Sequence, residues 1–110
     1  MAFSSQSLTM SGTGTSDWLI LDHTTSIFTV SIAGVFSAGA NLVYTVDVTN
    51  ETLSGPTDTT VVGIALDSMT ALGASSIKSL VGPVVGVRIR VTSHTGGSVK
   101  LVIKQSGGHI

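Results

Sequence analysis

The stretch VRIRVTSHTGGSVKLVIK, residues 87–104, decides the fold class of this chain. Apolar residues at positions 87, 89 and 91 alternate with polar ones, and the alternation resumes at 99, 101 and 103. This two-residue period is typical of half-buried β-strands, because successive side chains of a strand point to opposite faces of a sheet. Two such runs joined by a loop that contains Gly96 and Gly97 predict an antiparallel hairpin.

The same period recurs toward the amino terminus, in residues 28–32 and 42–48, with a turn over residues 35–41. Residues 18–21 form a short apolar run, and residues 59–66 and 77–81 read as further strands. Residues 68–74 are either a single helical turn or a loop. Residues 6–10 are a first strand candidate, and the alternative is an extended amino-terminal arm over residues 1–10.

Composition supports an all-β class. The chain has 110 residues, 31 Ser and Thr, 13 Gly, two Pro and no Cys. A chain of this length can bury a single core, and roughly six to eight short strands with frequent polar turns favour a sandwich or a small barrel. We therefore predict one domain over residues 1–110, an antiparallel β-sandwich of jelly-roll-like topology. Its predicted core residues are Phe28, Val30, Ile32, Tyr44, Val46, Val87, Ile89, Leu101 and Ile103.

The charge and hydropathy of the sequence argue against two classes of function, nucleic-acid binding and membrane insertion. The net charge is −1 and 10% of residues are charged, whereas binding to nucleic acid normally needs a surplus of Lys and Arg. No apolar segment reaches the roughly 18 residues of a membrane helix, and no basic region followed by an apolar stretch opens the chain. We expect a soluble protein made in the cytoplasm that binds neither nucleic acid nor membrane.

Candidate catalytic and metal-binding residues do not form a convincing set. Asp22, His23 and Ser26 are the residue types of a nucleophilic triad, but neighbours on a strand point to opposite faces and the nucleophile-elbow motif is missing. Histidines 94 and 109 lack the spacing of a zinc site, and the aspartates lack a calcium-loop pattern. We expect no enzymatic activity, no cofactor and no metal.

The cationic residues give the most informative pattern. Four of the five Lys and Arg residues fall at polar positions of the alternating runs, where they would share one face of the predicted hairpin: Arg88, Arg90, Lys100 and Lys104. Like charges on one face need acidic neighbours, such as Asp47, or an anionic partner. They form either a solvated face or a docking surface for an acidic protein. On a solvent face, replacing both arginines with Gln would change stability by about 0.5 kcal/mol at most.

Two segments, GPVVGVRIRVTS (82–93) and GSVKLVIKQ (97–105), resemble the carboxyl-terminal strands of many small bacteriophage virion proteins. In size, lack of Cys and Ser/Thr/Gly-rich strands, the whole chain also resembles the capsid decoration, or cement, proteins of tailed phages. The resemblance implies a virion structural protein that binds the major capsid protein on the capsid exterior. It further implies a homo-oligomer, a trimer somewhat ahead of a dimer. The alternative is a receptor- or glycan-binding module of a head or tail fibre.

Overall fold

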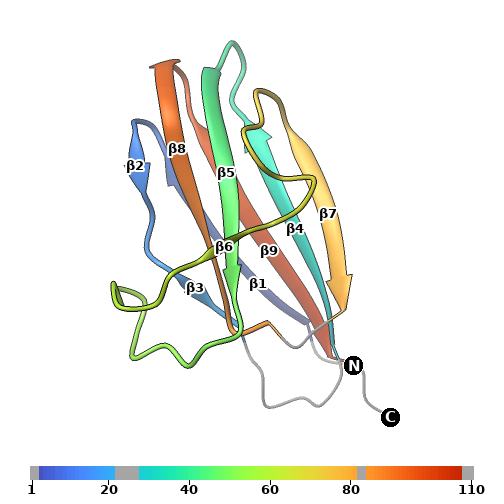
Figure 1. Cartoon of the computed structure of the whole chain (residues 1–110). Helices are drawn as coiled ribbons and strands as arrows, with labels where there is room; N and C mark the ends of the chain where they lie inside the picture. Colours follow the sequence, from blue (N-terminus) through green and yellow to red (C-terminus); the bar gives the residue numbers. More distant parts are fainter. Residues whose placement is uncertain (1–2, 22–27, 82–83, 108–110) are drawn as a thin grey trace.

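The computed structural model describes residues 3–21, 28–81 and 84–107. Every regular element in this part of the chain is a β-strand, and no helix in it could span a membrane. The nine strands, shown in Figure 1, are β1 (Phe3–Met10), β2 (Gly14–Thr15), β3 (Leu19–Ile20), β4 (Phe28–Phe36), β5 (Asn41–Thr49), β6 (Ile64–Ala65), β7 (Ser76–Val81), β8 (Gly86–Gly96) and β9 (Val99–Gly107).

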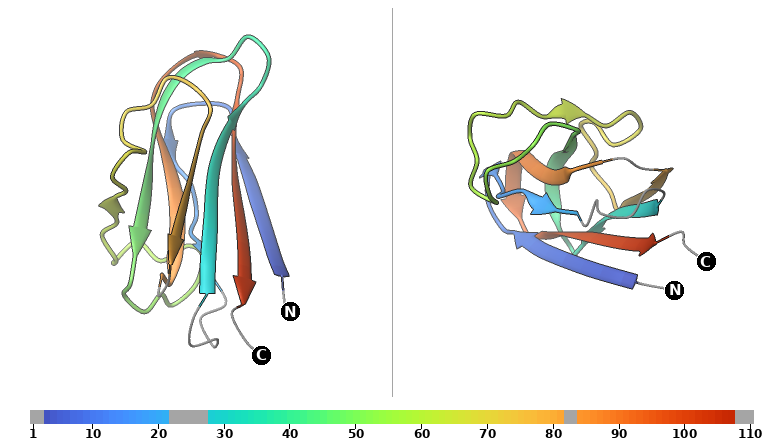
Figure 2. Two further views of the ribbon diagram at one scale, coloured as in Figure 1. Left: turned by 90° about the vertical axis from the view of Figure 1, so that its right-hand side faces the viewer. Right: turned by 90° about the horizontal axis from the view of Figure 1, so that it is seen from below.

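The strands form two antiparallel sheets that pack face to face (Figure 2, left). Sheet A has the order β1-β9-β4-β7, and sheet B has the order β2-β8-β5-β6 with β3 also paired to β8. The chain changes sheet at almost every connection, as in a jelly roll, in which β2 and β3 together occupy one strand position. The predicted sandwich and its jelly-roll-like topology are confirmed.

The predicted hairpin over residues 87–104 is wrong. β8 belongs to sheet B, where it pairs with β5, and β9 belongs to sheet A, where it lies between β1 and β4. The turn between them carries the chain from one sheet to the other, with Gly97 at a φ of 76° that favours glycine. A Cβ on Gly97 would also lie 2.5 Å from the Cα of Ala40. The two runs therefore face each other across the core.

The inward faces of the two sheets form one core, centred on residues such as Ile32, Tyr44, Ile89 and Leu101. Every predicted core residue whose side chain is described is buried, which confirms the assignment of the inward faces. The side chain of Phe28 lies outside the described part. Tyr44 donates a hydrogen bond from its hydroxyl to the Ala74 carbonyl at 3.1 Å, and its burial raises the pKa of the phenol.

The two outer faces of the sandwich differ. The segment between β5 and β7 runs along the outside of sheet B (Figures 1 and 2), where the outward-facing Thr45, Asp47 and Thr49 are buried. Ala71, on this segment, donates its backbone N–H to the Thr45 hydroxyl at 2.9 Å. The outer face of sheet A carries no comparable cover from the described residues. Its outward side chains are exposed or half-buried wherever their burial is described.

The amino-terminal segment is an integral strand from Phe3 onward. β1 pairs with β9 residue by residue, from Phe3 opposite Ser106 to Met10 opposite Val99. The extended arm considered for residues 1–10 is therefore not what residues 3–10 form. The inward side chains of β1, among them Leu8 and Met10, pack against the core, which explains why this stretch pairs within the sheet.

Candidate functional site

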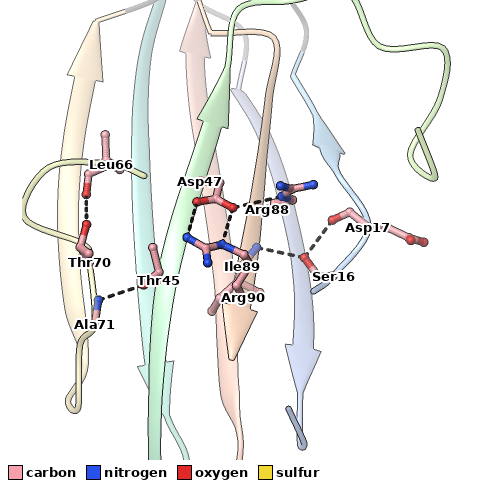
Figure 3. A network of polar contacts seen from close by, with 10 residues as sticks. All are labelled: Ser16, Asp17, Thr45, Asp47, Leu66, Thr70, Ala71, Arg88, Ile89 and Arg90. Atoms are coloured by element: carbon pink, nitrogen blue, oxygen red, sulfur yellow. Dashed lines mark hydrogen bonds and ion pairs between the residues drawn. The ribbon is translucent and has the colours of Figure 1, made fainter. Parts of the chain in front are cut away.

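Arg88 and Arg90 lie on the outer face of sheet B and share one buried carboxylate (Figure 3). Asp47, on β5, faces Arg88 directly across the strand pair. Its Oδ2 accepts hydrogen bonds from Arg88 Nε at 3.1 Å and Arg90 Nε at 2.7 Å, and its Oδ1 accepts one from Arg90 Nη2 at 3.1 Å. The hydrogen bonds that Arg90 donates to Asp47 raise the pKa of its guanidinium. Both arginines therefore form their ion pairs within the molecule.

Trp18 closes this cluster on the side of Arg88. Its ring stacks on the Arg88 guanidinium at 4.5 Å, a cation–π contact, and its side chain is 2% exposed. The indole Nε1 donates to the carbonyl of Asp58 at 3.2 Å. Asp47 and Trp18 lie so close to Gly63 that no side chain fits there, because a Cβ would lie 2.6 Å from the Cβ of Asp47. This packing holds the segment between β5 and β7, which we call the covering segment, on sheet B.

The turn beneath Trp18 is built around the carboxylate of Asp58. Its oxygens accept four hydrogen bonds, two from the backbone and hydroxyl of Ser54 and two from those of Thr60. These bonds, with the backbone N–H of Ser54 contributing most, hold the pKa of Asp58 well below its usual range. The carboxylate therefore serves the turn rather than a ligand.

A small open pocket of about 140 Å³ lies between this turn and the arginine cluster. Trp18, Arg88, Asp17 and Asp58 line it, together with hydroxyl side chains. The guanidinium of Arg88 and the carboxylates of Asp17 and Asp58 all border this pocket, so the charges around it favour neither an anion nor a cation. We assign no ligand to it.

Lys100 and Lys104 lie on the opposite side of the molecule from the arginines. Both point outward from β9, at the centre of sheet A, and both are exposed. Lys100 is opposite Val35 and Lys104 is opposite Ser31. The sequence-based grouping of all four cations on one face is therefore wrong, because β8 and β9 belong to different sheets. Asp47 is the acidic neighbour expected for the arginines, whereas the lysines have no acid on their sheet among the described residues.

We call the outer side of sheet A the lysine face. Between the lysines lies a cross-strand row of Val102, Ala33 and Ile77, of which Ile77 is 69% exposed. Val35, beside Lys100, is 46% exposed. Among the side chains that the structure describes, the remaining outward positions are small and hydroxyl-bearing: Ser5, Ser7, Thr9, Thr29, Ser31 and Ser79. The face is thus low in relief, apolar at its centre and cationic.

Charge is separated between the two sides of the sandwich. The described strands of sheet A carry three lysines and no acidic residue, a net charge of +3. The rest of the described chain carries five acidic residues against two arginines, a net charge of −3. A molecule with this distribution presents its positive side to an acidic surface.

The apolar part of the lysine face was missed by the sequence analysis. Outward-facing Val35, Ile77 and Val102 interrupt the polar positions of three strands, but those strands had not been placed side by side. The regular alternation of outward hydroxyl residues with inward residues in 5–10 and 28–33 was the sequence signal for an open, weakly polar outer face.

The catalytic and metal-binding candidates gain no support where they can be placed. Within the described residues, no three His, Asp or Glu side chains are grouped so that they could hold a metal ion. The ring Nε2 of His94 lies 2.8 Å from the Gly97 carbonyl, within the turn between β8 and β9. Asp22, His23, Ser26 and His109 lie outside the described residues.

Comparison with known proteins identifies no family. No family model and no curated protein matches the chain. Among solved structures, one similar chain comes from the disulfide-linked pili of Bacillus endospore appendages, with a TM-score of 0.42, 14% identity, and coverage of 94% of this chain and 85% of that one. Another comes from infectious bursal disease virus, Gx strain, with a TM-score of 0.32, 14% identity, and coverage of 97% and 29%. Similarities of this size assign neither a family nor a function.

Proposed function

We propose that this chain is a structural protein of a virion, a non-enzymatic module that docks on the outer surface of a tailed-phage capsid and stabilises it. The lysine face is the observation that carries the proposal. It is open, lies on continuous regular strands, and bears no acidic residue among those that the structure describes. Rigid strands present such a face without the entropic cost of ordering a loop on binding.

The composition of the lysine face suits an acidic protein partner. Val102 and Ile77 supply apolar contact in the row between the two lysines, and Val35 adds apolar contact beside Lys100. The two lysines are four residues apart on one strand, which separates them by about 13 Å. Charges so placed steer encounter and fix orientation, while the apolar centre supplies contact area. Many copies on one particle add such contacts through multivalency.

The test is the binding of the purified protein to purified capsids, measured by co-sedimentation as a function of salt. We expect Lys100→Gln and Lys104→Gln each to weaken binding and to reduce its dependence on salt, because exposed charges are screened over about 8–10 Å at moderate ionic strength. Lys78→Gln is the matched control. It removes a cation from the same sheet, but one that is half-buried at its edge and donates to the Asp67 carbonyl.

Two results would count against this function. Binding that is unchanged in the double variant Lys100→Gln/Lys104→Gln would show that the lysine face is not the docking surface. Electron microscopy that places the subunit on a fibre rather than on the shell would favour the receptor- or glycan-binding alternative.

The glycan-binding alternative lacks an exposed aromatic platform in the described side chains. Trp18 and Tyr44 are 2% and 0% exposed, and Phe36 packs against the core at 5.6 Å from the Tyr44 ring. Sugar sites commonly stack the apolar face of the sugar on an exposed ring. These aromatic residues serve the interior instead.

A further inference from the structure

Most edge strands of this sandwich carry a feature that discourages pairing with another chain. β2, β3 and β6 are two residues long. β7 places Lys78 opposite the buried Ile32, half-buried and turned to donate its Nζ to the Asp67 carbonyl at 2.8 Å. Short edge strands and inward-pointing charges are recognised means of blocking edge-to-edge association.

β1 has none of these features. It is eight residues long, it pairs with β9 without a register shift, and its sequence FSSQSLTM contains no charge, Pro or Gly. Its other edge pairs with no described strand. Along this edge, the half-buried Leu8 and Met10 mark the border of the core. The edge is therefore both unprotected and adjacent to incompletely covered apolar side chains.

We propose that β1 pairs antiparallel with β1 of a second copy across a two-fold axis, joining two copies of sheet A into one continuous eight-stranded sheet. An uncharged strand meets itself without repulsion, and closed two-fold symmetry satisfies the open edge of both copies at once. The proposal uses a different surface from the lysine face and does not rest on the proposed function.

The pairing has a defined register class. A two-fold axis perpendicular to the sheet keeps both outer faces on the same side, so odd-numbered residues of β1 face odd-numbered residues of its partner. The axis then passes through Gln6 or Ser7. Outward hydroxyls of Ser5, Ser7 and Thr9 face one another, a favourable cross-strand combination. On the inner side, Leu8 lies opposite Ser4 of the partner copy if the axis passes through Gln6, and opposite Gln6 if it passes through Ser7.

Sedimentation velocity on the full chain tests the pairing. One strand pair is a small interface, so the useful range is from about 1 to 500 µM. The variant Ser5→Lys/Ser7→Lys sets like charges across the axis and is expected to weaken dimerisation about tenfold or more. The matched control, Ile77→Lys/Ser79→Lys, adds the same charges with the same spacing at the outer face of the β7 edge.

A wild-type dimer that the β1 variant dissociates and the β7 control preserves would establish the pairing. A wild-type monomer throughout this range, a trimer, a β1 variant that still dimerises, or equal dissociation of both variants would overturn it. Hydrogen exchange of wild-type peptides from residues 3–10 is the second measurement, needed if the β1 variant misfolds. Protection that rises with protein concentration supports pairing through β1, and protection independent of concentration refutes it. Dimerisation of Lys100→Gln/Lys104→Gln is expected to stay normal, which separates this inference from capsid docking.

Discussion

Replacing the two arginines of β8 is the sharpest test of the sheet assignment. Arg90→Gln removes two of the three hydrogen bonds that arginines donate to Asp47, and Arg88→Gln removes the third together with the stack on Trp18. A hydrogen bond to a charged group contributes about 1.5–3 kcal/mol. The Arg90 side chain is 37% exposed, against 17% for Arg88, so screening by solvent reduces its share.

The double variant leaves the carboxylate of Asp47, 1% exposed, without a counter-charge. Removing the partners of a buried charge costs about 3–5 kcal/mol, and we expect Arg88→Gln/Arg90→Gln to lower the free energy of unfolding by this amount. Urea unfolding followed by Trp18 fluorescence measures it. Adding Asp47→Asn to the double variant is expected to restore part of the loss, since it removes the uncompensated charge.

The matched control is Lys100→Gln/Lys104→Gln, which removes the same charge from the open face of sheet A. Exposed positions of this kind change stability by about 0.5 kcal/mol at most. If the arginine variant lost no more stability than the lysine variant, the four cations would be equivalent, as the sequence pattern alone predicted. The assignment of β8 and β9 to different outer faces would then be wrong.

Further predictions concern the covering segment and the core. Gly63→Ala is expected to lower the free energy of unfolding by about 1–3 kcal/mol, because its Cβ would overlap that of Asp47, and urea titration measures this. Ile89→Ala is expected to cost about 2–5 kcal/mol in the same assay, and a loss near zero would contradict its burial. For Asp58, the folded-state pKa is depressed below its ordinary value of 3.8. Its contribution to the turn is therefore complete above that pH and is lost as pH falls further toward the folded-state pKa. The free energy of unfolding, measured by urea titration, is expected to fall as pH is lowered from about 4 in the wild type and to fall less over the same interval in Asp58→Asn, which lacks this titrating group.

The strands and their inward faces could be predicted from the sequence because both depend on local alternation. Val87, Ile89 and Val91 face the core for the same reason that Leu101 and Ile103 do: each strand has one face against apolar neighbours. Burial of one face determines which residues point inward, whatever strand lies beside them. This is why the core prediction succeeded even though the predicted hairpin was wrong.

The pairing of β8 and β9 could not be predicted in the same way. Two alternating runs joined by a short loop have the same pattern in a hairpin and in a connection between facing sheets. The difference lies in the conformation of the turn and in the partners that each strand finds, β5 for one and β1 with β4 for the other. Those partners are distant in sequence, so their choice is a tertiary effect.

The candidate surface depends on that same choice. Alternation places Arg88 and Lys100 outward with equal weight, but one outer face is covered and the other is open. The cover comes from the irregular segment between β5 and β7, which has too little periodicity for its position to be inferred from sequence. Asp47 was named as a partner for the cations, and the structure limits that role to the two arginines.

The two proposals combine into a definite geometry. A two-fold axis perpendicular to sheet A turns the lysine faces of both copies to the same side, so the proposed dimer presents four lysines from Lys100 and Lys104 on one continuous sheet. Docking of one copy then places the second at high effective concentration over the same acidic surface, which strengthens attachment without a new type of contact. The segment between β5 and β7, which carries Asp58 and Asp67 along the outside of sheet B, then lies on the far side of both copies. If docking occurs as proposed, an acidic surface repels this side, on which the described acidic residues outnumber the arginines, so we expect attachment in a single orientation.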